Sequence, residues 1–230
     1  ELGFVAHPED ARSGAGLPYE TEQLAFVLTG PRHAASLHSR KPDAVDFFDA
    51  KGIVQGLLAY LHVEGARFEA ANEAPFQPGV CARVSVGGLR LGTVGALHPE
   101  VAARFDLEGA HVFVGDFAVD ALLSVARPDF LSEDLPRFPS VDLDISLLIA
   151  AEIPVDHVFD VIHDAGGSLL YGASIFDVYE GTGVPEGQKA LAFRIWVNAG
   201  DRTLTMEEAM TVRKAITTEM VSKLNATIRE

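Results

Sequence analysis

Residues 141–149 read Val-Asp-Leu-Asp-Ile-Ser-Leu-Leu-Ile, and this stretch sets the interpretation of the last part of the chain. Apolar and polar side chains alternate along it, which is the pattern of a β-strand with one buried face. Pro154 follows and begins a segment in which apolar residues recur at helical spacing, until Gly166-Gly167 ends it. The sequence therefore predicts a strand followed by a helix that packs on its apolar face.

Four more elements are predicted after this pair. Strands are expected at 169–180 and 189–198, joined by a glycine-rich hairpin at 181–187. Thr205-Met206-Glu207-Glu208 has the spacing of a capping box, so a helix should begin there, and residues 225–229 read as a short closing strand. The order strand, helix, strand, strand, helix, strand is that of the ferredoxin-like βαββαβ sandwich, which leaves one face of its sheet free of helices.

Residues 1–126 read as a separate unit that mixes strands and helices, joined by a connector at 127–137 to residues 138–230. Apolar residues at spacings of three and four predict a helix over 45–61. Alternation at 81–86 and 89–97 around Gly87-Gly88 predicts a hairpin. The remaining expected elements are strands at 1–5, 24–29 and 111–117 and short helices near 98–100 and 121–123. The predicted class is α+β, with an antiparallel sheet in each unit.

Composition excludes several kinds of site. Cys81 is the only cysteine among the 230 residues, so an internal disulfide and a multi-cysteine zinc site are excluded. It lies in an alternating strand and reads as a small buried residue, in keeping with a reducing cytoplasm. His157 and His163 point to different faces of a helix, so no metal site is predicted. No apolar run approaches the roughly 18 residues that cross a membrane, and because the first residue is Glu1 we expect a piece of a longer protein.

Three local features bear on catalysis, and we prefer a structural interpretation of each. The glycines at 181–187 lie between strands, whereas a phosphate loop needs a helix start, so they read as a hairpin. Asp142 and Asp144 share a strand face and can do acid–base work, but no basic partner is linked to them by the sequence, which favours a solvated face. His98 is either a ligand or base, or a residue that begins a helix, and we favour the helix. No catalytic residue is predicted.

The candidate binding surface is the helix-free face of the C-terminal sheet. If the large apolar residues of 189–198 point to the helices, the other residues of that strand point away. The outward set is then Ala192, Arg194, Trp196 and Asn198, joined by Asp177, Tyr179 and Arg229 from neighbouring strands. Aromatic and arginine side chains on an open sheet can stack unpaired bases and bind phosphates.

Charge places the basic residues in the same region. Residues 189–229 carry seven basic and four acidic side chains, whereas the whole chain has a formal net charge of −15, the wrong sign for a nucleic-acid partner. RNA must therefore meet a local patch. The predicted RNA-binding residues are Tyr179, Lys189, Arg194, Trp196, Arg202 and Arg229. For Trp196 the alternative is a contact with another domain or subunit, because aromatic residues are also enriched at protein interfaces.

Four segments follow one another in this region with a distinctive order and spacing. They are Phe138-Pro139-Ser140-Val141, Phe176-Asp177-Val178-Tyr179-Glu180-Gly181, Lys189-Ala190-Leu191-Ala192-Phe193-Arg194 and Arg202-Thr203-Leu204-Thr205-Met206-Glu207-Glu208. Together they resemble the ferredoxin-fold anticodon-binding domain of the bacterial phenylalanyl-tRNA synthetase β subunit. Asp46-Phe47-Phe48-Asp49-Ala50-Lys51-Gly52 and Gly92-Thr93-Val94-Gly95-Ala96-Leu97-His98-Pro99-Glu100 resemble the synthetase-like domain of that subunit. Asp142 and Leu143 stand where the family usually has basic residues.

The resemblance implies a division of labour between the two units. Residues 1–126 would form part of a class II synthetase-like domain without catalytic motifs, and residues 138–230 would bind the anticodon stem-loop of phenylalanine tRNA. The whole enzyme would be a cytoplasmic heterotetramer of two α and two β subunits, using ATP and Mg²⁺ on α, with no cofactor in this segment. Two alternatives are an amino-acid-sensing ferredoxin-like module and a pure protein-assembly domain, because fold does not determine function.

Overall fold

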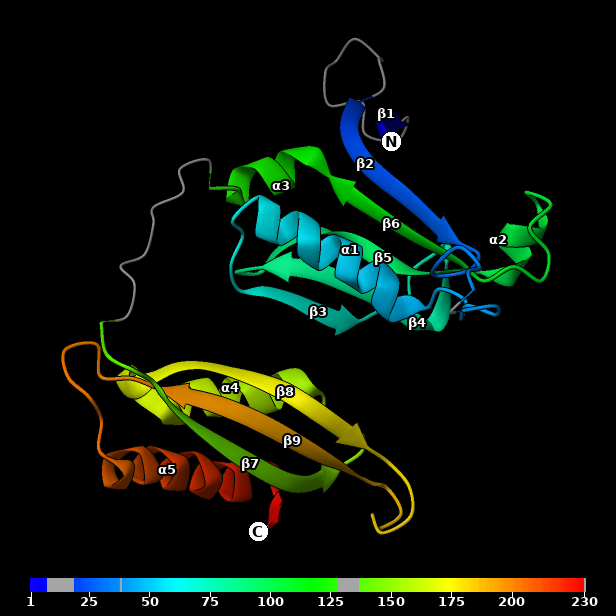
Figure 1. Cartoon of the computed structure of the whole chain (residues 1–230). Coiled ribbons are helices and arrows are strands. Elements are labelled where there is room, and N and C mark those ends of the chain that lie inside the picture. Colours follow the sequence, from blue (N-terminus) through cyan, green and yellow to red (C-terminus); the bar gives the residue numbers. More distant parts are fainter. Residues whose placement is uncertain (8–18, 38, 128–136, 230) are drawn as a thin grey trace. The chain divides into compact units, whose positions relative to one another are not determined.

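The computed structural model describes residues 1–7, 19–37, 39–127 and 137–229. The chain divides into two compact units, residues 1–131 and 132–230, which are described separately (Figure 1). Most of the predicted connector at 127–137 lies outside the described residues, so its boundaries stay a prediction.

The first unit contains a six-stranded antiparallel sheet in the order β1-β2-β6-β5-β4-β3 (Figure 1). The strands are β1 Leu2–His7, β2 Tyr19–Thr29, β3 Ala66–Ala70, β4 Phe76–Val86, β5 Leu89–Leu97 and β6 Val112–Ala118. The helices are α1 Phe47–Tyr60, α2 Pro99–Ala103 and α3 Val119–Val125. The predicted strands and helices of this unit are confirmed. β3 was not predicted, because its five residues hold a single large apolar side chain, Phe68, and so give little alternation.

The start of α1 is determined by two aspartates. The Asp46 carboxylate accepts hydrogen bonds from the backbone N–H groups of Phe48 and Asp49, and the Asp49 carboxylate accepts one from the N–H of Asp46, at 2.8–3.0 Å. This is a capping box. Arg32 donates to both carboxylates, which lowers the pKa of Asp49. From this start, Ala50, Val54 and Leu58 of the helix pack on the sheet.

Two short-range signals in the first unit have the predicted structure. Gly87 and Gly88 join β4 to β5 with φ of 56° and 85°, the positive values that a two-residue hairpin turn of type I′ requires. His98 begins α2, since its Nδ1 accepts a hydrogen bond from the N–H of Glu100 at 3.3 Å. The helix-start interpretation of His98 is therefore confirmed, and Cys81 is buried as predicted.

The second unit is the predicted ferredoxin-like sandwich. Its strands β7 Val141–Ala150, β8 Leu170–Tyr179, β9 Gln188–Val197 and β10 Thr227–Arg229 form an antiparallel sheet in the order β10-β7-β9-β8. The helices are α4 Val155–Gly166, followed by one 3-10 turn at Gly167–Leu169, and α5 Met206–Leu224 (Figure 1). The prediction of an α+β chain that ends in this fold is confirmed.

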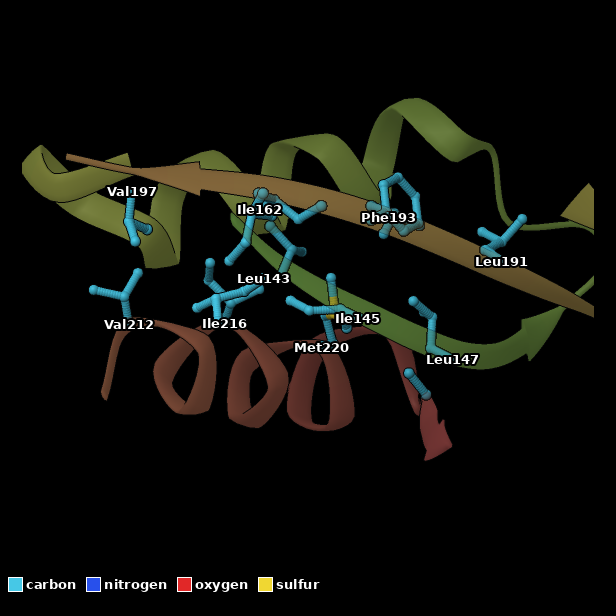
Figure 2. Close-up of a cluster of buried hydrophobic side chains, with 14 of the residues drawn as sticks. Leu143, Ile145, Leu147, Ile162, Leu191, Phe193, Val197, Val212, Ile216 and Met220 are labelled. Atoms are coloured by element: carbon cyan, nitrogen blue, oxygen red, sulfur yellow. The ribbon is translucent and has the colours of Figure 1, made fainter. Parts of the chain in front are cut away.

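Both helices of this unit pack on the same face of the sheet. Figure 2 shows Val212, Ile216 and Met220 of α5 pointing to the apolar residues of β7 and β9. The side chains of Ile145, Phe193, Ile195, Ile216 and Met220 have no exposed surface. Since burial of a large apolar side chain contributes about 1.5–3 kcal/mol, this one-sided core holds α4 and α5 on one face of the sheet, and neither helix covers the other face.

The N-terminus of α5 is held by a charged capping box. The Glu208 carboxylate accepts hydrogen bonds from the N–H and hydroxyl of Thr205 at 2.9 and 3.0 Å, and it forms an ion pair with Arg202 at 2.8 Å. The bond from Arg202, followed by those from Thr205, lowers the pKa of Glu208 from 4.5 to about 2. The folded chain therefore favours the ionised form more strongly than the unfolded chain does.

This shift predicts an acid-dependent loss of stability. Because the pKa of Glu208 is lower in the folded chain, its contribution is present above about pH 4.5 and is lost as the pH falls toward 2. Replacing Glu208 by Gln should reduce the fall in melting temperature of the second unit over that interval, measured by circular dichroism. Glu207→Gln, which removes the neighbouring carboxylate outside the capping box, is the control. An unchanged pH profile in Glu208→Gln would contradict this role.

Candidate nucleic-acid interface

The helix-free face of the second sheet, called the open face below, is organised in cross-strand rows. In one row, Arg194 of β9 lies between Asp144 of β7 and Ser174 of β8. In the next row, Trp196 lies between Asp142 and Gly172. The open face includes Asp142, Asp144, Ser146, Gly172, Ser174, Phe176, Asp177, Tyr179, Ala192, Arg194, Trp196 and Arg229. These residues come from all four strands.

Arg194 is held by two neighbours on this face. Its Nε and Nη2 donate to the two carboxylate oxygens of Asp144 at 2.8 and 3.0 Å, a bidentate pair. Its guanidinium carbon also lies 5.4 Å from the centre of the Phe176 ring. The hydrogen bonds between Arg194 and Asp144 lower the pKa of the Asp144 carboxyl and raise the pKa of the Arg194 guanidinium. Both side chains are about half exposed, at 46% for Arg194 and 51% for Asp144. Arg194 is thus a basic partner of Asp144, which strand alternation alone does not reveal.

Trp196 lies over a glycine of the adjacent strand. A Cβ atom added to Gly172 would lie 3.4 Å from Cε3 of the Trp196 indole, so the ring lies over the glycine. The indole is half-buried there and faces away from the helices. Because Gly172 has no side chain, a large flat ring can lie close to the sheet. The register of β9 against β7 and β8 confirms the outward orientation predicted for Trp196.

Tyr179 ends β8 at the opposite end of the open face. Its side chain is exposed, and the hydroxyl donates to the carbonyl oxygen of Thr182 at 3.1 Å. The glycine-rich segment after it joins two antiparallel neighbours, β8 and β9, so the hairpin interpretation is confirmed. The tyrosine ring thus lies beside the hairpin loop, where an unpaired base can reach it.

Phe176 is a part of the face that the sequence did not reveal. The register of β8 against β9 shifts between Ile175 and Asp177, so Phe176 and Asp177 are both exposed. Uninterrupted alternation outward from Asp177 would have turned Phe176 toward the helices. A bulge of this kind has no reliable signal in a single sequence, although the sequence Phe-Asp-Val-Tyr does concentrate two aromatic residues there.

The other predicted RNA-binding residues fall into two groups. Arg229 is exposed in β10, opposite Ser146, and belongs to the open face. Lys189 is only 9% exposed, and its Nζ donates to the carbonyl oxygen of Ala151 at 2.9 Å. Arg202 lies in the connector before α5 and is paired with Glu208. The structure therefore brings together Tyr179, Arg194, Trp196 and Arg229, and it places Lys189 and Arg202 elsewhere, each with a protein partner.

Asn198 does not have the outward orientation that alternation predicted. β9 ends at Val197, and the next residue leaves the pattern. Asn198 is buried, donates from Nδ2 to the carbonyl oxygen of Phe138 at 2.8 Å, and accepts from the N–H of Gly200 at 2.6 Å. It ties the start of the unit to the end of β9, so the prediction that it contributes to the binding surface was wrong.

The open face carries more acidic than basic groups. Asp142, Asp144 and Asp177 are its carboxylates, and Arg194 and Arg229 are its cations. A surface with this balance attracts phosphate weakly. Its aromatic rings and its guanidinium group can instead stack on unpaired bases, which is the sequence-tolerant part of single-strand recognition.

Other kinds of site find little support in the described ranges. Among these residues, no three histidine, cysteine, aspartate or glutamate side chains come together in a way that could hold a metal ion. No helix there is both long and apolar enough to cross a membrane. Burial raises the pKa of the Cys81 thiol, which favours its neutral form.

Comparisons with known proteins cover almost the whole chain. The profile of the family described as "Phenylalanyl tRNA synthetase beta chain CLM domain" matches residues 1–119, and that described as "Ferredoxin-fold anticodon binding domain" matches residues 136–229. The phenylalanine–tRNA ligase β subunit of Symbiobacterium thermophilum is 36% identical over 230 residues, which is 100% of this chain and 25% of the relative. That of Moorella thermoacetica is 38% identical over 232 residues, 100% of this chain and 28% of the relative. The chain spans about a quarter of the length of these relatives.

Proposed function

Because this chain belongs to the phenylalanyl-tRNA synthetase β-chain family, we propose that its second unit binds the anticodon stem-loop of phenylalanine tRNA on the open face. The observation that carries the proposal is the grouping of Tyr179, Arg194 and Trp196 on a sheet face that neither α4 nor α5 covers. Sheets of this kind bind single-stranded RNA by stacking exposed bases on aromatic and arginine side chains. The anticodon loop supplies such unpaired bases.

The first unit has a different role in this proposal. It forms part of a class II synthetase-like domain that does no chemistry and associates with the α subunit of the enzyme. The second unit holds the tRNA while phenylalanine is joined to the distant acceptor end on α. We assign ATP and Mg²⁺ to the α subunit, no cofactor to this segment, and a cytoplasmic assembly of two α and two β subunits to the whole enzyme.

A binding titration tests this function. The chain should bind phenylalanine tRNA weakly, more tightly than the same tRNA with a replaced anticodon, and less tightly at higher salt because counterions are released where phosphates meet Arg229. Fluorescence anisotropy of labelled tRNA at two salt concentrations measures both effects. An affinity that is the same for both anticodons and at both salt concentrations would contradict the proposal. A thermal shift with phenylalanine, without any response to tRNA, would favour the amino-acid-sensing alternative.

A further inference from the structure

We propose that Arg194 is a stacking platform for an unpaired base rather than a phosphate anchor, and that Asp144 is the positioning residue that keeps it in this role. The proposal deepens the anticodon-binding function and rests on it. Arginine can serve RNA in either way, since its guanidinium group is both a cation with a fork of donors and a flat plane. The surroundings of Arg194 on the open face distinguish the two roles.

Two of the five N–H donors of the Arg194 guanidinium are already engaged. A phosphate anchor presents two parallel N–H groups to the oxygens of its ligand. In Arg194 two N–H groups, on Nε and Nη2, are directed at Asp144 in that same bidentate manner. A phosphate binding in the same geometry would have to displace the carboxylate.

The local charge also disfavours a phosphate at this position. Asp144 compensates the charge of Arg194 directly. Asp142 lies on the same strand as Asp144, β7, in the neighbouring cross-strand row opposite Trp196. Both aspartates are exposed, and a phosphate that approached Arg194 would come near both of them. The net field around Arg194 therefore does not attract a second anion, whereas an uncharged base meets no such repulsion.

The geometry that remains suits stacking. The guanidinium carbon lies over the ring of Phe176, 5.4 Å from its centre, and nearly half of the Arg194 side chain is still exposed to solvent. Trp196 lies two residues along the same strand, and Tyr179 is opposite Ala190, four residues in the other direction. At about 3.4 Å per residue along the strand these positions are roughly 7 and 14 Å from Arg194, so each platform meets a different base.

Replacing Arg194 by Lys separates the two roles, because lysine keeps the charge and loses the plane. If Arg194 stacks on a base, Arg194→Lys and Arg194→Ala should both weaken binding of the anticodon stem-loop by roughly 5- to 100-fold. The slope of log affinity against log salt should equal that of the wild-type chain in both variants. If Arg194 binds a phosphate, Arg194→Lys should keep most of the affinity and Arg194→Ala should reduce the slope by about 0.7. That result would overturn the proposal.

Replacing Asp144 by Asn tests the positioning role. The amide has the size of the carboxylate but no charge, so Arg194 is released to bind a phosphate and the salt slope should steepen by about 0.7. Asp142→Asn removes the same charge from the same strand without breaking the bidentate pair, and it should leave the slope at the wild-type value. Equal salt slopes in Asp144→Asn and Asp142→Asn would contradict the positioning role of Asp144.

The outcomes also separate this proposal from the function on which it rests. Wild-type chain that binds without regard to the anticodon contradicts the proposed function. Wild-type chain that binds selectively, with affinity retained by Arg194→Lys, contradicts the stacking role alone. Thermal unfolding of each variant checks that the second unit is folded, which is expected because these side chains lie on the open face and not in the core.

Discussion

Replacing Tyr179 and Trp196 together by alanine should reduce the affinity of the chain for the anticodon stem-loop by at least roughly 30-fold. Each base that stacks on an aromatic side chain contributes about 1–3 kcal/mol, so two lost platforms cost about 2–6 kcal/mol. The two residues lie at opposite ends of the open face, with Tyr179 opposite Ala190 and Trp196 opposite Gly172, so their effects should be nearly additive. Fluorescence anisotropy of a labelled stem-loop measures the loss.

A matched control is an exposed tyrosine outside the open face. Tyr60 ends α1 in the first unit and is 82% exposed. Tyr60→Ala should leave the affinity for the stem-loop at the wild-type value, whereas each single variant of the pair should show part of the loss. Wild-type affinity in the double variant would mean that RNA binds elsewhere on the molecule.

The largest effect on stability is expected for Phe193→Ala, at about 3–5 kcal/mol. Phe193 has no exposed surface, and its ring meets that of Phe159 from α4 edge to face, with centroids 5.2 Å apart. Truncation removes this contact and leaves a cavity between β9 and α4. Trp196 is the only tryptophan in the chain and lies three residues away, so its fluorescence during urea unfolding reports on the second unit specifically.

The control for this substitution is a phenylalanine at the surface. Phe176 in β8 of the same unit is 55% exposed, and Phe176→Ala should change the unfolding free energy by less than about 1 kcal/mol, since it removes only a surface contact with Arg194. A loss below about 1 kcal/mol in Phe193→Ala would contradict the position of Phe193 in the core. It would also remove the support for a sheet that is covered on one face only.

Local patterns predicted the elements of this chain well. Alternation along 141–149 and 189–198, the Gly87-Gly88 turn and the capping box at Thr205 are each determined by residues close together in sequence. β3 was missed because one apolar residue gives no period, and Asn198 was misplaced because alternation stops where its strand ends.

The candidate site could be predicted only in part, for a related reason. Which residues face away from the helices follows from strand alternation, so Arg194 and Trp196 were found. The pairing of Arg194 with Asp144 depends on the register of two strands whose paired residues are 50 positions apart, and nothing local determines it. The outward orientation of Phe176 depends on a bulge in β8, which no local pattern in the sequence determines either. The charge of Lys189 favours a role in RNA binding, whereas its burial follows only from the fold.

The charge of the chain is consistent with this mode of binding. A net charge of −15 and three carboxylates on the open face would repel phosphates and so weaken binding that relied on phosphate contacts. Stacking on rings and on a compensated guanidinium group depends little on charge. We therefore expect an interface that prefers unpaired bases to duplex and has weak affinity by itself.

The most direct test of this account is the fluorescence of Trp196 during a titration with RNA, because it is the only tryptophan of the chain and lies on the open face. A stem-loop carrying the anticodon of phenylalanine tRNA should change its emission saturably, through stacking of a base on or beside the indole. A duplex of the same stem without the loop should cause little change. Binding of the stem-loop that leaves Trp196 emission unaltered, or an equal response to the duplex, would contradict the central claim.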